Sequence, residues 1–456
     1  MKKLLSFVLI CVIIVVLLPL TFGCKKTTTA ETTAAETTVA ETTAAETTAT
    51  ATESTTVEKK YEGVELKFMV HAASAGEPAL IKFAEDFYNR TGAKINIESV
   101  AWENIMQKLM ASIQAGGGGY DFYYTNPEFA YTLWPDLLPL NDLMQKYNFD
   151  ISDFLEPAKK MGVGLGDDPN LRYTLPAELV VAPVFYNKKM IPEFPKTWVD
   201  YDKALQSNTN PPKYGLAVAG VMVQTIKLFL ARFWSSGDPL FTPDWKPLIN
   251  NENGIKALTM LKNTMSNYST PGVLAWDNPD AGAAFAAGDA AVYEGWMGNV
   301  VPLLIDPKEN QIGADWDVTK YPENGTGNMT DNSFAIMKNC KNPDAAFEFI
   351  TEFINKENSK NWAVEYGMTS ARQSIYNDPD VLKANPFFKG YSEALSVAKP
   401  FAFKVPQWIE LFIPLGEGVS KYLSNETKDP KTALDEVAQK WTTSIEANKP
   451  SFEYKE

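Results

Sequence analysis

The order and spacing of the apolar runs in the sequence predict an α/β fold built from parallel βαβ units. Residues 64–70, 94–100 and 120–125 read as short β-strands. Between them, residues 78–91 and 102–115 carry apolar side chains at the three- and four-residue spacing of an amphipathic helix. A strand–helix–strand–helix–strand order of this length favours parallel strands joined by crossover helices.

Candidate ligand-binding side chains follow the predicted strands. In parallel sheets, ligands bind at the carboxyl ends of the strands, in the loops that leave them. Trp102 and Glu103 follow the second strand, and Asn126 and Glu128 follow the third. The Trp102 indole could instead pack against the helix that it begins, so the sequence leaves a binding role and a packing role open.

The N-terminal residues predict export. Two lysines precede an apolar run over residues 4–20, as in a signal peptide. Gly23 and Cys24 resemble the cleavage point of a bacterial lipoprotein, where the cysteine receives a lipid, although Thr21 stands where that motif usually has Leu. The alternative is an uncleaved membrane helix. We expect a signal peptide over residues 1–23 and, in either case, a folded part held outside the cytoplasm.

A low-complexity segment separates this signal from the folded part. Residues 24–59 repeat Thr, Ala and Glu with almost nothing apolar to bury. Such a composition cannot offset the entropy of ordering, so we expect a disordered linker between the membrane and the domain.

Composition excludes several classes of function. The formal net charge is −14 and the chain has no basic block, which argues against nucleic acid as a partner. Besides Cys24 and Cys11 of the signal, Cys340 is the only cysteine, and His71 is the only histidine. These counts do not favour a disulfide framework, a zinc site or a Ser-His-Asp triad, so we expect no metal and no cofactor.

Three motifs in a fixed order indicate a family. Residues 285–296 read as a small-residue helix followed by an aromatic, and residues 186–188 (Tyr-Asn-Lys) precede Pro-Lys-Thr-Trp at residues 195–198. Residues 342–349 read as a helix after a strand. Together the motifs resemble the family 1 extracellular solute-binding proteins, the sugar-binding receptors of ABC importers. The resemblance runs from about Val64 to the C-terminus.

This resemblance implies a periplasmic-binding-protein-like fold of two α/β lobes with a ligand cleft between them. The chain would cross the hinge three times, near Glu178, Asp331 and Gly367. The lobes would then comprise residues 60–178 plus 331–366 (N-lobe) and residues 179–330 plus 367–456 (C-lobe). Closure of such a cleft requires contacts between the ligand and both lobes.

Sugar recognition needs aromatic rings for the apolar face of the sugar and polar groups for its hydroxyls. The resemblance places Trp296, after Glu294, in the cleft, and aligns Trp408 with a C-terminal aromatic segment that contacts sugar. Trp408 could instead be the buried start of a helix, and Trp234 is a further aromatic candidate.

Polar candidates lie near the expected crossings. Glu178, Asp331 and Arg372 are hinge or cleft candidates. Arg372 could equally hold its own loop by pairing with Asp378, and the sequence leaves both readings open.

The resulting hypothesis is a monomeric, lipid-anchored receptor on the cell surface or the periplasmic face of the plasma membrane. It would bind a carbohydrate, with an oligosaccharide as the favoured candidate, and deliver it to the transmembrane subunits of an ABC permease. Two alternatives are a receptor for peptide, phosphate or metal, and an exported glycoside hydrolase or lyase that uses two carboxylates. A metal receptor would need more His or Cys, and a phosphate receptor a less acidic surround.

Overall fold

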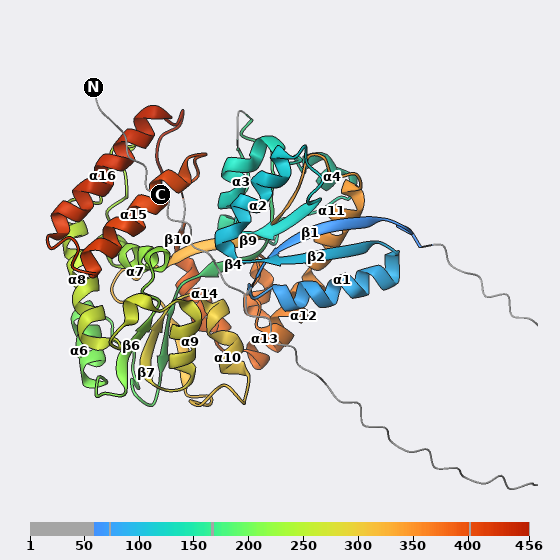
Figure 1. Ribbon diagram of the computed structural model, residues 1–456. Helices are drawn as coiled ribbons and strands as arrows, with labels where there is room; N and C mark the ends of the chain where they lie inside the picture. Colours follow the sequence, from blue (N-terminus) through green and yellow to red (C-terminus); the bar gives the residue numbers. More distant parts are fainter. Residues whose placement is uncertain (1–58, 73, 166–167, 401–402, 456) are drawn as a thin grey trace, which may run out of the picture. The chain divides into compact units, whose positions relative to one another are not determined.

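The computed structural model describes residues 59–72, 74–165, 168–400 and 403–455 (Figure 1). The expected signal peptide, Cys24 and nearly all of the Thr/Ala/Glu segment lie outside these residues, so the statements about them stay predictions. In the described part of the chain, two β-sheets organise the fold.

The first sheet begins with the βαβ units expected from the sequence. Its first elements are β1 (Glu65–His71), α1 (Glu77–Thr91), β2 (Lys94–Val100), α2 (Trp102–Gln114) and β3 (Phe122–Thr125). Strand β1 lies between β2 and β3 and pairs with both in parallel, so that Phe68 lies opposite Ile97 and Phe122. The prediction of a parallel arrangement is confirmed.

Aromatic packing holds α1 on this sheet. The rings of Phe68 and Phe122 stack with centroids 4.1 Å apart, and Phe83 and Phe87 of α1 are buried on the same side as Phe349. Complete burial of one such side chain contributes about 1.5–3 kcal/mol. Helix α1 ends at Gly92, whose φ of 82° is the left-handed conformation that glycine adopts without steric cost.

Long strands from later in the chain complete the first sheet. Strand β9 (Asn328–Ile336) is antiparallel to β3 and to β4 (Leu175–Val181), and parallel to the short β10 (Lys399–Pro400). Every residue of β9 is buried. Strand β4 leads directly into β5 (Val184–Asn187), and β8 (Trp316–Thr319) precedes β9. Since β5 and β8 belong to the second sheet, β4 and β9 are the strands through which the chain passes between the sheets.

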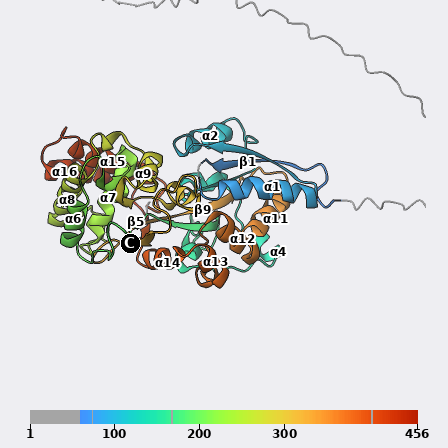
Figure 2. The same cartoon turned by 90° about the horizontal axis from the view of Figure 1, so that it is seen from below.

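The second sheet has the order β6–β7–β5–β8, with β6 (Tyr214–Val218) parallel to β7 (Ala290–Glu294). Helices surround it in both views (Figures 1 and 2). They are α6 (Trp198–Ser207), α7 (Met222–Trp234), α8 (Glu252–Tyr268), α9 (Asn278–Ala286), α10 (Val301–Ile305), α15 (Trp408–Leu423) and α16 (Pro430–Ala447). Helix α15 packs on α7 and on α16, so the C-terminal helices belong with this sheet.

The first sheet has its own helices and connecting turns. They are α3 (Glu128–Leu133), α4 (Asn141–Lys146), α5 (Glu156–Lys160), α11 (Pro343–Phe353), α12 (Lys356–Tyr366) and α13 (Pro379–Ala384). Helix α14 (Phe388–Ser396) lies against β8 and β4, one from each sheet. The described residues also form four short 3₁₀ turns, η1 (Trp134–Asp136), η2 (Val273–Ala275), η3 (Met297–Asn299) and η4 (Gln373–Asn377). The architecture is thus two α/β lobes, while the residue boundaries of the lobes stay a prediction.

Residues 285–296 do not form the helix expected from the sequence. Helix α9 ends at Ala286, and residues 290–294 form the buried strand β7. Gly288 between them has a φ of 77°, a left-handed conformation that ends the helix. The small side chains of this motif therefore serve a helix end and a central strand, and Trp296 follows the strand.

Within the described residues, none of the helices combines the length and the apolar character that a membrane span requires.

Candidate functional site

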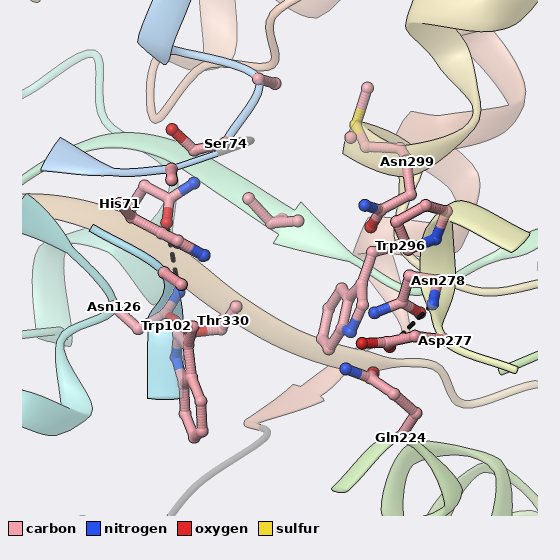
Figure 3. A pocket seen from close by; sticks show the side chains of 18 of the residues that line it. His71, Ser74, Trp102, Asn126, Gln224, Asp277, Asn278, Trp296, Asn299 and Thr330 are labelled. Carbon is pink, nitrogen blue, oxygen red and sulfur yellow. Dashed lines mark hydrogen bonds between the residues drawn. The ribbon is translucent and has the colours of Figure 1, made fainter. Parts of the chain in front are cut away.

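The candidate site is a cavity of about 310 Å³ whose walls come from both lobes (Figure 3). One wall follows the carboxyl ends of β1, β2 and β3 and includes His71, Trp102 and Asn126. The opposite wall is built by the first residues of α7 and α9 and by the residues that follow β7, among them Trp296. Of the side chains expected from the sequence, Trp102, Glu103, Asn126, Glu178 and Trp296 line this cavity.

In the first wall, Asn126 holds Trp102 against β9. The Trp102 indole Nε1 donates to Asn126 Oδ1 over 2.7 Å. Asn126 Nδ2 donates to the carbonyl oxygen of Asp331 at 2.9 Å and to Asn332 Oδ1 at 3.2 Å. Both hydrogens of the Asn126 amide are therefore committed to protein acceptors. Asn126 lines the cavity, but its geometry suits the positioning of Trp102 more than the donation of a hydrogen bond to a ligand.

Glu178 is held below this wall by three donors. Asn332 Nδ2 donates to Glu178 Oε1 at 2.6 Å, and the Tyr124 hydroxyl donates to the same oxygen at 2.5 Å. The Thr369 hydroxyl donates to Oε2 at 3.2 Å. Burial raises the pKa of Glu178, and the three hydrogen bonds oppose that rise. The donors Tyr124 and Asn332 belong to β3 and β9, so the buried Glu178 ties β4 to both strands as well as lining the cavity.

His71 ends β1 beside this network. Burial lowers the pKa of His71 to about 4, because the imidazolium is poorly solvated there, and neighbouring Glu77 and Asn332 only partly oppose the effect. Its Nδ1 has no hydrogen-bond partner among the described residues. Because this nitrogen is itself buried, the neutral imidazole lines the cavity without presenting Nδ1 on its surface.

In the second wall, Trp296 lies next to amide side chains. Gln224 is in the first turn of α7 and Asn278 in the first turn of α9 (Figure 3). The buried Lys227, one turn further along α7, contacts both of them. Asp277 precedes α9 and forms a capping box with Asp280, so its carboxylate already accepts hydrogen bonds from backbone N–H groups.

The wall of the cavity is acidic. Glu103, Glu178 and Asp277 line it, whereas none of the described residues lining it is Lys or Arg. Such a surround disfavours an anionic ligand.

Six expected site residues lie outside the cavity wall, and their contacts explain why. Trp408 is fully buried at the start of α15, with its ring centroid 6.1 Å from that of Phe129. Trp234 is also buried, and the Lys399 ammonium lies 5.6 Å from its ring centroid. For Trp408 the structure agrees with the alternative reading of a buried helix start, and both indoles pack the interior.

Glu294 is a buried ion-pair partner. Arg232 Nη1 and Nη2 donate to its two carboxylate oxygens, both at 2.9 Å, and the Tyr201 hydroxyl donates to it at 2.7 Å. The Glu294 and Arg232 side chains have no exposed surface. A carboxylate committed in this way to three donors has no route to a ligand in the cavity, which corrects the expectation for Glu294.

Glu128 and Asp331 lie behind the wall that Thr330 forms. The Thr330 hydroxyl donates to Glu128 Oε1 at 2.9 Å, and Ser333 Oγ donates to Asp331 Oδ2 at 2.9 Å. Burial raises the pKa of Glu128 to about 7 and the pKa of Asp331 well above its usual value. These carboxyl groups support the strands and do not reach the cavity.

Arg372 does not line the cavity, and it holds its loop without pairing with Asp378. Its Nε donates to the Ile354 carbonyl oxygen at 2.7 Å, and its Nη1 lies 3.7 Å from Asp153 Oδ2. Asp378 pairs with Lys360 instead, at 3.2 Å. Arg372 therefore anchors its loop, but through partners that the sequence did not indicate.

Sequence reasoning missed several side chains of the wall: His71, Gln224, Asp277, Asn278, Asn299 and Thr330. A signal existed for His71, which begins a loop already expected to bind ligand. The first residues of α7 and α9 carry no comparable signal, because only the packing of the second lobe brings these helix starts to the cavity.

Comparison with known proteins gives a consistent picture. Residues 73–360 match the family model for bacterial extracellular solute-binding proteins. A probable amino-acid ABC transporter periplasmic-binding protein of Sinorhizobium fredii is 22% identical over 72% of this chain and 77% of its own length. The galactooligosaccharide-binding protein of Bacillus subtilis is 25% identical over 59% of this chain, and the match spans 64% of that protein.

Similarity of fold extends over most of the chain. The maltose-bound structure of T. maritima MalE3 superposes with a TM-score of 0.76, at 17% identity, over 84% of this chain and all of that one. The similar proteins are binding proteins rather than enzymes. From the family match and the two-lobed fold, we conclude that this chain belongs to the bacterial extracellular solute-binding protein family, the ligand receptors of ABC transporters.

Proposed function

We propose that this protein binds a neutral carbohydrate or polyol in the cavity between its lobes. The observation that carries the proposal is the placement of Trp102 and Trp296 on opposite sides of one cavity, with the amide side chains of Gln224 and Asn278 beside Trp296 (Figure 3). An indole face matches the apolar C–H face of a sugar ring, and amides match its hydroxyl groups.

The charge of the cavity supports a neutral ligand. Glu103, Glu178 and Asp277 line it, without a Lys or Arg among the described lining residues. A free amino acid or peptide would bring a carboxylate, and a phosphate two negative charges, into this acidic surround. The name of the Sinorhizobium relative makes amino acids a necessary part of any ligand test, although the described residues of the wall include no Lys or Arg to pair with their carboxylates.

The size of the cavity supports a short ligand. Its volume of about 310 Å³ lies at the lower end of the range of about 300–1000 Å³ that is typical of small-molecule sites. We therefore propose a monosaccharide, a polyol or a short oligosaccharide rather than a long chain. The galactooligosaccharide named for the Bacillus relative and the maltose bound to MalE3 supply starting points for a panel.

The rest of the proposed function concerns transport. A monomeric receptor, anchored through lipid on Cys24 and a flexible spacer, would close on its ligand and deliver it to the transmembrane subunits of a permease. Contacts with both lobes give the ligand a higher affinity for the closed state, and this difference drives closure.

Isothermal titration calorimetry of the folded domain tests the proposal. The panel contains galactobiose, maltose, maltotriose, D-mannitol and ribitol, beside amino acids, a dipeptide and inorganic phosphate. We expect micromolar binding, about −8 kcal/mol, for at least one sugar or polyol and none for the anions. Binding confined to amino acids or phosphate would contradict the proposal, and steady release of cleaved sugar would show an enzyme instead.

A further inference from the structure

A lysine that does not line the cavity holds together three groups that do. Lys227, in the second turn of α7, has only 1% of its surface exposed. Its ammonium donates to Gln224 Oε1 at 2.7 Å and to Asn278 Oδ1 at 3.2 Å. It also lies 5.8 Å from the ring centroid of Trp296. Gln224, Asn278 and Trp296 come from three elements of the second lobe and all line the cavity.

We propose that Lys227 is a positioning residue for ligand binding: it turns the side-chain NH₂ groups of Gln224 and Asn278 toward the ligand and fixes the ring of Trp296. This inference rests on the proposed function and assigns the second wall a chemical preference for hydrogen-bond acceptors, namely the hydroxyl and ring oxygens of a sugar.

The orientation of the two amides follows from hydrogen-bond chemistry. An ammonium group has three donors and no acceptor, so an amide beside it presents its carbonyl oxygen. The NH₂ groups of Gln224 and Asn278 are then left without an acceptor among the described residues. Unpaired donors on a cavity wall bind ligand oxygens at little cost, because the protein has no competing bond to break.

The position of Lys227 is fixed from its other side. Its carbonyl oxygen accepts a hydrogen bond from Asn328 Nδ2 at 2.8 Å, which ties α7 to the start of β9. Burial lowers the pKa of Lys227 to about 7, and the carboxylates of Asp277 and Glu294 partly oppose this effect, although Glu294 is already paired with Arg232. A cation buried with neutral amides and an aromatic ring costs desolvation energy that a hydrophobic residue would avoid. Such a cost is typical of residues retained for function rather than for stability.

The test begins with Lys227→Met, which keeps the length of the side chain but removes the donors. The probe is the tightest-binding sugar or polyol of the panel above, titrated by calorimetry. We expect the affinity to fall at least tenfold while the midpoint of urea unfolding stays the same or rises. A matched control is Lys262→Met in α8, which removes a Lys hydrogen bond to the Tyr422 carbonyl and a contact with its ring, away from the cavity.

A second pair of variants leaves Lys227 in place, in case its replacement disturbs folding. Gln224→Glu and Asn278→Asp keep the oxygens that face the ammonium and replace each NH₂ with an oxygen. We expect each to weaken sugar binding at least tenfold without loss of folding. Unchanged affinity in both would overturn the assignment of these groups as ligand donors.

A double-mutant cycle separates positioning from a purely structural role. In a Gln224→Ala/Asn278→Ala background, Lys227→Met should weaken binding further by less than threefold, because the two amides that it positions are gone and only its contact with the Trp296 ring remains. An equal loss in both backgrounds, or an unchanged affinity of Lys227→Met alone, would overturn the inference. If the wild-type protein binds no sugar or polyol at all, the proposed function itself fails, which is a different result.

Discussion

The indole nitrogen of Trp102 donates to the amide oxygen of Asn126 over 2.7 Å, and Asn126 in turn donates to β9. The loops at the carboxyl ends of β2 and β3, two strands that flank β1, are thereby locked to each other and to a strand that leads into the other lobe. The Trp102 ring, which we propose as one stacking surface, is therefore oriented by a hydrogen bond. It also packs against Phe129, with the two ring centroids 5.7 Å apart.

This relationship predicts the effect of Asn126→Ala. We expect sugar affinity to fall about three- to tenfold, because Trp102 loses its hydrogen-bond partner while remaining in place by packing. Asn126→Asp is the informative companion, since it retains the acceptor for Trp102 but not the donors to β9. Calorimetry should show a smaller loss of sugar affinity for Asn126→Asp than for Asn126→Ala. The reverse order would mean that the hydrogen bonds donated to β9 matter more than the one accepted from Trp102.

Replacement of Trp296 by Ala should weaken sugar binding at least tenfold, since an indole at the cavity is lost, with little change in unfolding. The control is Trp408→Ala. Its fully buried ring should leave a cavity that destabilises the protein by about 3–5 kcal/mol. Calorimetry and urea unfolding of both variants check these values, and an unchanged affinity for Trp296→Ala would remove that residue from the site.

The buried pair of Arg232 and Glu294 predicts an asymmetry between single and paired substitutions. Glu294→Gln leaves the guanidinium buried without a compensating charge and should cost about 3–5 kcal/mol of unfolding free energy. Arg232→Met combined with Glu294→Gln removes both charges and should recover a substantial part of that loss. Denaturant unfolding of Glu294→Gln, of Arg232→Met and of the double variant measures the effect; additive losses would contradict a direct pairing.

Glu128 should make stability depend on pH. Its pKa is raised to about 7 in the folded protein, from an ordinary value near 4.5. Between these values the folded state binds more protons than the unfolded state. The contribution of Glu128 is therefore fully present below pH 4.5 and is lost as the pH rises through about 7.

Glu128→Gln keeps an acceptor for Thr330 and removes the ionisation. The difference in unfolding free energy between variant and wild type should shift in favour of the variant as the pH rises from 4.5 to 7.5. Glu85→Gln on the exposed face of α1 serves as a control. The pKa values of Asp331 and Glu178 are also raised. The slope of unfolding free energy against pH should therefore be smaller in the variant than in the wild type, but it should not vanish. Equal slopes for variant and wild type would contradict the shift.

Local patterns were sufficient for the first sheet. The predicted strands and helices between residues 64 and 125 agree with β1 to β3 to within one or two residues at most ends. Each element there is set by its own periodicity and by glycines that end the helices. The same reasoning placed Trp102, Glu103 and Asn126 at the cavity, because the carboxyl ends of parallel strands share one edge.

Local patterns were insufficient where small residues serve two purposes. The alanines after Phe285 have high helix propensity, yet residues 290–294 pair with β6 and β5 as a central strand. Pairing with distant strands outweighs the modest differences in propensity, so the helix stops at Ala286.

Periodicity, composition and motif order in the sequence thus determined an α/β protein of this receptor family and two indoles for its cleft, Trp102 after a predicted strand and Trp296 after a segment predicted as a helix. Only the tertiary structure decided which side chains face the cavity. Glu294 and Trp296 are two residues apart, but the first meets Arg232, 62 positions away, and the second meets the cavity. Burial and pairing depend on segments that are distant in the chain, and no local pattern encodes which distant group will be the neighbour.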